Sequence, residues 1–198
     1  MSAATDVESA VEEVVLLDDE GAPIGVADKR LVHGTDTPLH LAFSCYGFAD
    51  DGRMLLTRRA LAKPTWPGVW TNACCGHPSP GEDPQQAVVR RVRRELGVEP
   101  RDLRLVLPDF RYRAVAADGI VEHEVCPVWF AELPTTLAPD PDEVLEWAWV
   151  QPSAFLDLAE RAPFVLSPWS VLQAQELLRG GHLAADAHPD DRVELARR

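Results

Sequence analysis

A thiol, an imidazole and a pair of carboxylates are the residues of this sequence with the most evident capacity for chemistry. Cys75 stands two residues before His77, in a run that is otherwise poor in polar reactive groups. Glu122 and Glu124 alternate along an apolar segment, so in a strand both point to the same face. Two carboxylates on one face of an apolar strand repel each other unless a cation lies between them. The carboxylates therefore indicate a metal site, and the thiol with its neighbouring imidazole suggests at first a Cys–His catalytic pair.

Further imidazoles complete a candidate set of metal ligands. His33 and His40 stand in a segment rich in glycine, threonine, aspartate and proline, and this composition predicts a loop. Taken singly, each histidine is more often a surface or core residue than a ligand. Together with the paired carboxylates they favour a Zn²⁺, Mn²⁺ or Mg²⁺ ion. The predicted ligands are His33, His40, His77, Glu122 and Glu124.

The segment after His77 predicts a helix that handles phosphate. Asp83 is a suitable N-cap and Pro84 suits the first helical position. Apolar residues then recur every four positions until Gly97 ends the helix. A Nudix box, whose helical carboxylates hold divalent metal against a diphosphate, matches this stretch at seven positions: Gly76, Glu82, Arg90, Val92, Glu95, Gly97 and Val98.

Two glutamates of the Nudix box are absent. Arg91 and Arg94 occupy their positions, which leaves Glu95 as the one matching carboxylate on the helix. One Mg²⁺ ion is then expected, but not a multi-metal hydrolytic centre. The pattern predicts chemistry on a phosphorylated substrate that leaves the phosphate intact.

At these residues the sequence resembles type I isopentenyl-diphosphate Δ-isomerase, a Nudix-fold family that does not hydrolyse diphosphate. The resemblance covers roughly residues 10–175. It rests on motifs that occur in order along the chain: His33 with His40, residues 55–60, 66–72, 75–78, 94–97 and 109–113, Glu122 with Glu124, and residues 167–169.

The resemblance implies that the chain interconverts isopentenyl diphosphate and dimethylallyl diphosphate, an early step in isoprenoid synthesis. A proton is added at one carbon and removed from another, by way of a carbocation. Cys75 and Glu124 correspond to the two proton-transferring groups, which lie on opposite faces of the substrate. Tyr112 corresponds to the tyrosine beside the acid, and Trp169 to the ring that faces the substrate.

The resemblance also implies two metal ions. The three histidines and two glutamates hold a Zn²⁺ or Mn²⁺ (or Mg²⁺) ion, so His77 serves that metal and not the thiol. Glu95 and the backbone carbonyl of Cys75 help to hold one Mg²⁺ that the diphosphate carries. The diphosphate itself is neutralised by basic residues: Lys29, Arg59, Lys63 and Arg91.

These residues are expected to be positioned by one domain. A chain of 198 residues is long enough for one substantial core and too short for two ordinary domains. We predict a Nudix-type domain over residues 13–180, between mobile tails at 1–12 and 181–198. Mixed strands with helices on the faces predict an α/β/α sandwich with a mixed sheet.

The predicted elements follow from turn signals and apolar periodicity. Hairpins are expected from residues 14–17 with 24–27, 41–48 with 53–57, and 110–116 with 120–132, and a further strand from 144–150. Helices are expected over 84–96, 152–160 and about 168–179.

Composition limits the partners and the compartment. The net charge of −13 argues against nucleic acid or an anionic membrane as a partner, and an anionic substrate then needs a local basic pocket. No apolar run is long enough to span a membrane. Four cysteines without a CxxC pair indicate free thiols in a reducing compartment. We therefore expect a cytoplasmic protein.

Two other functions are compatible with parts of the pattern. One is a Nudix pyrophosphohydrolase for a nucleoside diphosphate derivative, against which the two arginines argue. The other is a non-catalytic domain that keeps the fold and binds a metal or ligand, for which Cys75 is dispensable.

Overall fold

Two β-sheets and four α-helices form the part of the chain that the structure, a computed structural model, describes: residues 12–184 and 194–196. The smaller sheet has the strand order β2-β1-β3-β10-β9. Its strands are β1 (Glu13–Leu17), β2 (Pro23–Asp28), β3 (His40–Leu41), β9 (Arg111–Val115) and β10 (Val121–Val125).

The larger sheet has the order β13-β12-β5-β4-β11-β8, with β6 paired to β5 and β7 paired to β4. Its strands are β4 (Phe43–Phe48), β5 (Met54–Arg59), β6 (Trp70–Thr71), β7 (Cys74–Gly76), β8 (Arg101–Leu107), β11 (Val128–Glu132), β12 (Val144–Val150) and β13 (Glu194–Ala196).

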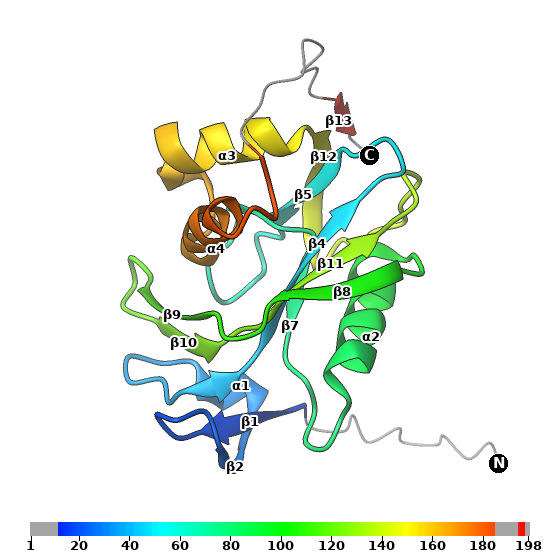
Figure 1. Ribbon diagram of the computed structural model, residues 1–198. Coiled ribbons are helices and arrows are strands. Elements are labelled where there is room, and N and C mark those ends of the chain that lie inside the picture. The colour runs from blue at the N-terminus through cyan, green and yellow to red at the C-terminus, as the bar shows by residue number, and fades with distance from the viewer. Residues whose placement is uncertain (1–11, 185–193, 197–198) are drawn as a thin grey trace, which may run out of the picture.

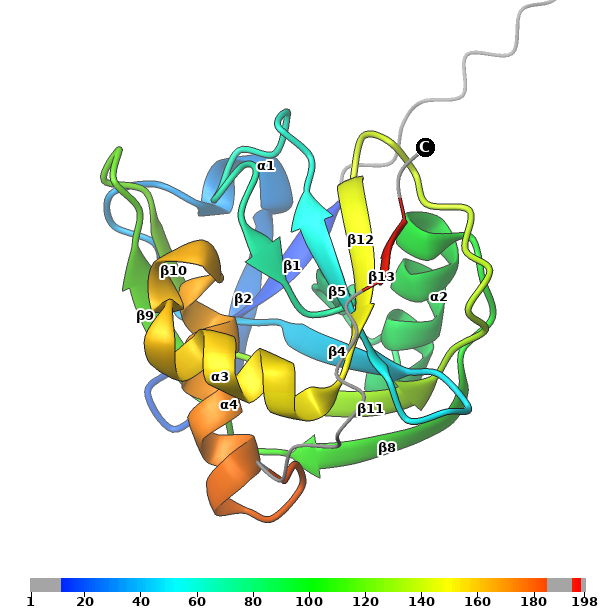
Figure 2. The same cartoon turned by 90° about the horizontal axis from the view of Figure 1, so that it is seen from above.

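Helices cover both faces of the larger sheet. The α-helices of the described residues are α1 (Lys29–Val32), which lies against the smaller sheet, α2 (Pro84–Leu96), α3 (Pro152–Arg161) and α4 (Pro168–Arg179), with a 3₁₀ turn at Pro163–Val165. Helix α2 lies on one face and α3 with α4 on the other (Figure 1, and from above in Figure 2). This is the predicted α/β/α sandwich with mixed sheets in a single domain.

Alternation along the central strands builds a separate core on each face. Leu55 of β5 points to the α2 side, where Val88 and Leu96 are fully buried. Its neighbour Leu56 points to the other side and packs with Phe155 and other residues of α3 and α4. Because successive residues of a strand face opposite ways, one apolar run supplies both cores.

The ends of α2 are where the sequence predicts them. The Asp83 side chain accepts a hydrogen bond from the Gln86 N–H, and Pro84 begins the helix. Gly97 ends it with a φ of 67°, and its N–H bonds to the Arg93 carbonyl. A side chain at Gly97 would meet the Ala138 carbonyl oxygen at 2.4 Å, so glycine is required there.

The predicted strand over residues 120–132 is wrong as one element, because it divides between the two sheets. β10 belongs to the smaller sheet and β11 to the larger one, and Cys126 and Pro127 separate them. Pro127 has no N–H to continue a ladder. The Cys126 N–H bonds to the Phe110 carbonyl, outside the strand pairs.

The segment 41–48 divides in the same way, at Ala42. β3 pairs with β10 and β4 pairs with β11, and both pairs are parallel. The expected hairpin between β4 and β5 has one paired position, Phe48 with Met54, because β4 pairs next with β7 and β5 pairs next with β6. At these two positions the chain passes from the inner strands of one sheet to the inner strands of the other, and the candidate site lies where the two sheets meet.

The predicted tails fall mostly outside the described residues. Glu12 is described and its carboxylate pairs with Lys29 at 2.6 Å. β13, within the predicted tail 181–198, pairs antiparallel with β12. The mobility of the two tails stays a prediction.

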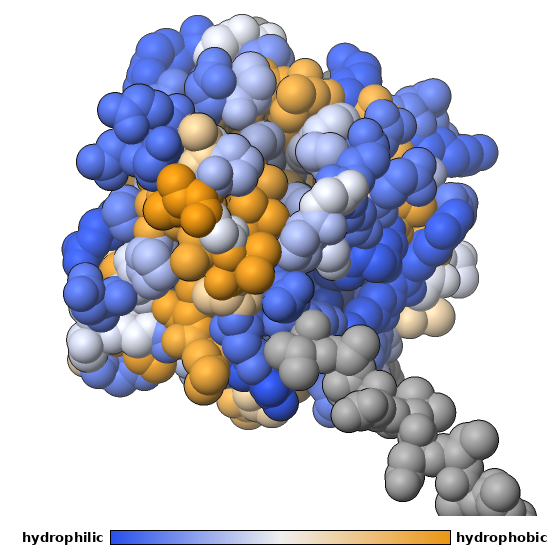
Figure 3. All heavy atoms as spheres, turned by 90° about the horizontal axis from the view of Figure 1, so that it is seen from below, coloured by the Kyte–Doolittle hydropathy of each residue, from blue (hydrophilic) through white to orange (hydrophobic). Residues whose placement is uncertain are grey.

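Seen from below, the molecule shows a group of apolar side chains on an otherwise largely polar face (Figure 3). Ile24 and Val26 of β2 are among the exposed large hydrophobic side chains. Among the helices of residues 12–184 none has the length and apolarity to cross a membrane.

Candidate active site

A cavity of about 170 Å³ opens at the corner between the two sheets. It gathers residues that are far apart in the sequence, and all the predicted site residues except His40 and Glu95 line it. The predicted residues on its wall are Lys29, His33, Arg59, Lys63, Cys75, His77, Arg91, Tyr112, Glu122, Glu124 and Trp169.

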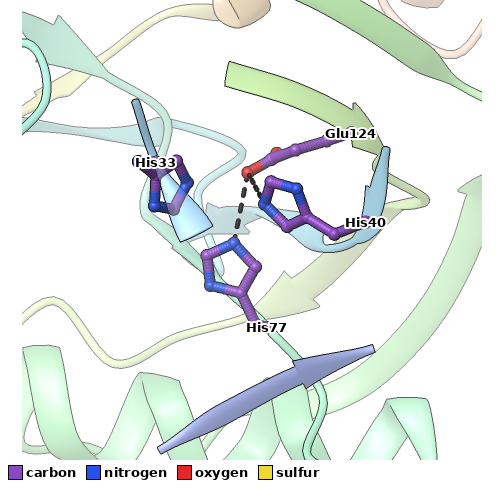
Figure 4. A group of neighbouring side chains, drawn as sticks. All are labelled: His33, His40, His77 and Glu124. Carbon is purple, nitrogen blue, oxygen red and sulfur yellow. Dashed lines mark hydrogen bonds and ion pairs between the residues drawn. The ribbon is translucent and has the colours of Figure 1, made fainter. Parts of the chain in front are cut away.

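Four side chains at one end of the cavity converge on a common point. They are His33, His40, His77 and Glu124, and one donor atom of each lies within 4.8 Å of the donor atoms of all the others (Figure 4). The sheet register explains part of this, because His40 and Glu124 are directly paired in the β3–β10 ladder. His33 caps the end of α1, and His77 follows β7.

The hydrogen bonds of these histidines leave nitrogen atoms free for a cation. The Pro38 carbonyl lies 2.9 Å from His40 Nδ1 and can only accept, so Nδ1 carries a proton. In the neutral ring, the lone pair of Nε2 then points toward Glu124 Oε1, at 3.5 Å. His33 Nε2, His40 Nε2 and His77 Nδ1 are all buried and have no hydrogen-bond partner within the described part of the chain. Such buried nitrogens are costly unless they bind an ion or a proton.

The electrostatics of the group are consistent with ligands that are ready to bind metal. Burial, with repulsion from the other two rings, lowers the pKa of His33 to about 4, so its lone pair is available at neutral pH. Burial opposes the charge of Glu124, but its close contacts with His40 and His77 and their attraction outweigh burial and lower its pKa. Three imidazoles and a carboxylate therefore fit a divalent cation.

Removal of the metal is expected to destabilise the protein measurably. When Zn²⁺ or Mn²⁺ is returned to chelator-treated protein, a free ion at a hundredfold excess over its Kd should add about 2.7 kcal/mol to the free energy of unfolding. The half-buried His33 lies at the end of a short helix, so His33→Ala should spare the fold and lose most of this gain. Thermal unfolding with and without metal measures the effect.

His123 provides the matched control for that experiment. It stands beside Glu124 but outside the four-residue group. The variant His123→Ala should keep the full metal-dependent stabilisation. An equal gain in His33→Ala would contradict the site.

Glu122 shares the face of Glu124, and Tyr112 contacts both carboxylates. Tyr112, the partner of Glu124 in the β9–β10 ladder, lies within hydrogen-bonding distance of Glu122 Oε2 at 2.6 Å and of Glu124 Oε2 at 2.9 Å. Burial and the Glu124 charge raise the pKa of Glu122 to about 7. The geometric group does not include Glu122, so its part as a metal ligand stays a prediction.

Cys75 presents a protonated thiol to the cavity. Burial raises its pKa to about 11, although contacts with Ser44 and Asn72 act in the other direction. Its Sγ lies 3.2 Å from Asn72 Oδ1 and 3.5 Å from Ser44 Oγ. Because Ser44 and Cys75 are directly paired between β4 and β7, the strand register fixes this contact.

Trp169 is held in place by the same asparagine. Its indole N–H donates to Thr71 Oγ1 at 3.0 Å and to Asn72 Oδ1 at 3.1 Å, and the side chain is buried. The Arg59 guanidinium lies 5.4 Å from the centre of its ring. The Trp169 ring therefore faces the Arg59 cation, and the hydrogen bonds of its indole N–H hold its orientation.

Four basic residues on the cavity wall supply the positive charge that an anionic substrate needs. Lys29, Arg59, Lys63 and Arg91 all line the cavity of a protein whose net charge is −13. Glu95 forms an ion pair with Arg91, and Glu143 pairs with Lys63 and, at 3.4 Å, with Arg91. The predicted diphosphate-binding residues are thus assembled, with carboxylates as their present counter-ions.

Sequence analysis did not identify three residues of this site: Ser44, Asn72 and Glu143. Asn72 ends one of the motifs in the resemblance, which was the available signal. Ser44 and Glu143 carry no local signal, because their contacts are with residues 31 and 80 positions away.

Comparisons with known proteins agree on a family. A NUDIX domain model matches residues 38–172. An isopentenyl-diphosphate Delta-isomerase of Agromyces mediolanus is 59% identical over 180 residues, which cover 90% of this chain and 86% of that protein. An isopentenyl-diphosphate Delta-isomerase of Paenarthrobacter aurescens is 54% identical over 179 residues, which cover 90% of this chain and 97% of that one.

Solved structures share the fold at much lower identity. The DR0079 protein of Deinococcus radiodurans superposes with a TM-score of 0.65 at 16% identity, over 85% of this chain and 100% of that one. A MutT protein of Methanosarcina mazei gives 0.56 at 18% identity, over 73% and 96% of the two chains. These similarities concern the architecture alone.

Proposed function

The chain belongs to the isopentenyl-diphosphate Delta-isomerases of the NUDIX family, and on that premise we propose how its residues interconvert isopentenyl and dimethylallyl diphosphate. The observation that carries the proposal is the convergence of a protonated thiol, a buried carboxylate, an aromatic ring and four cations on one cavity. Each has a separate task in the reaction.

Proton transfer is the work of Cys75 and Glu124. In the forward direction one of them gives a proton to the terminal alkene carbon, and the π electrons form the new C–H bond. The other removes a proton from the methylene carbon, whose C–H electrons form the new double bond. Since the reaction is reversible, each group acts as an acid in one direction and as a base in the other. Tyr112 orients Glu124 through its hydroxyl.

The intermediate between these steps is a tertiary carbocation, which water would quench. Trp169 offers it an electron-rich ring, and the buried surroundings of that ring exclude water. The hydrogen bonds to the indole N–H keep the ring from turning away.

The diphosphate is held by charge and not cleaved. We propose that Lys29, Arg59, Lys63 and Arg91 neutralise it, with an Mg²⁺ ion held by Glu95 and the Cys75 carbonyl oxygen. Arg91 occupies a position where a hydrolase of this fold has a metal-binding glutamate. A Zn²⁺ or Mn²⁺ (or Mg²⁺) ion on the three histidines and Glu124, with Glu122 as a further ligand, would set the acidity of the Glu124 carboxyl.

The substrate pair, the net charge of −13 and the cysteine usage support a cytoplasmic enzyme without nucleic-acid or membrane partners. A small anionic substrate can enter such a protein because the basic wall offsets its global charge locally.

Turnover in deuterated water tests the proposal. Isopentenyl diphosphate with Mg²⁺ should give dimethylallyl diphosphate that carries deuterium from the solvent, as measured by NMR, without release of phosphate. Nucleoside diphosphate derivatives serve as the comparison substrates. Phosphate release from them, with no deuterium in the isoprenoid, would instead support a pyrophosphohydrolase.

A further inference from the structure

A chain of buried polar side chains leads from helix α4 to the sulphur of Cys75. Gln173 Nε2 donates to Ser44 Oγ at 2.9 Å, and Ser44 Oγ lies 3.5 Å from Cys75 Sγ. Gln173 and Ser44 are both fully buried. The reaction described above does not use either side chain, and buried polar groups in contact with a reacting atom are seldom without consequence.

The direction of the hydrogen bonds along this chain is fixed at Gln173. The Tyr46 hydroxyl donates to Gln173 Oε1 at 2.9 Å, so the amide nitrogen faces Ser44 and must donate to it. The hydroxyl hydrogen of Ser44 is then free to donate elsewhere. Among the described residues, the two atoms that can receive it are Cys75 Sγ and, at 3.4 Å, Cys126 Sγ.

The direction is also fixed on the far side of the sulphur. Asn72 Nδ2 donates to the carbonyls of Cys45 at 3.0 Å and Cys74 at 2.8 Å, which turns Oδ1 toward Cys75. That oxygen accepts the thiol hydrogen at 3.2 Å. The sulphur of Cys75 therefore has an acceptor for its own proton on one side and a hydroxyl donor on the other.

We propose that Ser44 is a positioning residue that donates its hydroxyl hydrogen to the Cys75 sulphur whenever Cys75 has given up its proton. The proposal rests on the proposed function, in which Cys75 passes through the thiolate once in each turnover. When Cys75 acts as the acid, the S–H bond breaks, its electron pair stays on sulphur, and the proton goes to the alkene carbon. When Cys75 acts as the base, the thiolate takes a proton from carbon and the S–H bond forms. The reverse direction needs the same thiolate, so Ser44 acts in both.

Cys126 Sγ is a second acceptor for the Ser44 hydroxyl hydrogen when Cys75 is protonated. While Cys75 is a thiol bonded to Asn72, the Ser44 hydrogen can point to Cys126 with equal ease, because the two O–S distances differ by little. A negative sulphur attracts the hydroxyl more strongly than a neutral one. Rotation of the Ser44 hydroxyl about its Cβ–Oγ bond then directs the hydrogen to the Cys75 sulphur, and the thiolate is stabilised without water.

Steady-state kinetics of Ser44→Ala, with Cys126→Ala as the matched control, test the proposal. Loss of a hydrogen bond to a charged group should lower kcat by about 10–100-fold in Ser44→Ala. The KM for isopentenyl diphosphate should stay within about twofold, because the basic wall is untouched. Cys126→Ala removes the other sulphur beside the same hydroxyl and should keep kcat near the wild-type value.

Infrared spectroscopy supplies a readout that does not depend on turnover. The S–H stretching band of Cys75 is obtained as the difference between the wild type and Cys75→Ala. It should move in Ser44→Ala to the position of a sulphur without a hydroxyl donor, whereas in Cys126→Ala it should keep the position of a sulphur that has one, because Ser44 remains and Cys75 Sγ is then its acceptor. If Ser44→Ala does not fold, Ser44→Cys, which restores a weaker donor, should show an intermediate kcat and an altered band.

Two results would overturn the role of Ser44. One is a kcat within twofold of the wild type in Ser44→Ala. The other is an equal loss in Ser44→Ala and Cys126→Ala with an unmoved S–H band, which would reveal a packing role. Either result with an inactive Cys75→Ala leaves the proposed function standing, whereas an active Cys75→Ala removes the proposed function itself.

Discussion

Replacement of Cys75 by alanine is expected to lower kcat by about 10²–10⁴-fold, the range that general acid–base catalysis usually contributes. In the proposed mechanism the thiol is the proton carrier on one side of the substrate. Burial raises its pKa to about 11, so in the resting enzyme it holds the proton that the reaction moves. The loss should appear in turnover, with the KM for isopentenyl diphosphate and the unfolding midpoint nearly unchanged.

Cys74 provides the control for this variant because it is the adjacent residue in the same strand. Its side chain is buried against α2, on the opposite face of β7 from the cavity. Cys74→Ala should keep kcat and lose stability by the small amount that a buried sulphur contributes to packing. Full activity in Cys75→Ala would refute the isomerase mechanism and favour a binding domain that keeps the fold.

Replacement of Glu124 by glutamine should be at least as damaging, because one carboxylate has two tasks. In the proposed mechanism it is the second proton carrier, so kcat should fall by about 10²–10⁴-fold. It also closes the ligand group, since its Oε1 lies 3.2 Å from His77 Nε2 and 3.5 Å from His40 Nε2. Loss of a charged ligand should weaken metal binding as well, and calorimetric titration with Zn²⁺ or Mn²⁺ measures this separately from kcat.

Glu122→Gln is the comparison that separates the two tasks. Both carboxylates lie within hydrogen-bonding distance of the Tyr112 hydroxyl, and both are buried, so the variants disturb similar surroundings. If Glu122 is a ligand but not a proton carrier, its variant should lose metal affinity and keep more of kcat than Glu124→Gln. Equal kcat losses in the two variants would contradict the assignment of proton transfer to Glu124.

The local parts of the fold could be predicted from the sequence because their causes are local. Asp83, Pro84 and Gly97 act on the backbone within a few residues of themselves, and α2 begins and ends where they predict. The hairpin of β1 with β2 and the start of α4 at Ser167 were predicted for the same reason. The family was also predictable, since its motifs lie in order along the chain.

The division of two strands at Ala42 and Cys126 could not be predicted in this way. Each segment is a continuous apolar run in the sequence. The strand is interrupted where its pairing partner changes from a strand of one sheet to a strand of the other. β8, an edge strand whose residues are all exposed or half-buried, was not predicted because its pattern lacks an apolar face. Pairing between distant segments is decided by the assembled sheet and not by the residues of one strand.

By itself the sequence determined which residues have the capacity for this chemistry: a thiol beside a Nudix-like helix, paired carboxylates, three histidines and a set of arginines and lysines. Only the tertiary structure decided their partners. In the structure His77 contacts Glu124 and not Cys75, and the Cys75 sulphur contacts Asn72 and Ser44. The reason is that a residue's chemical type is a property of its side chain alone. Its protonation and its contacts depend on burial and on strand register, which exist only when the two sheets meet.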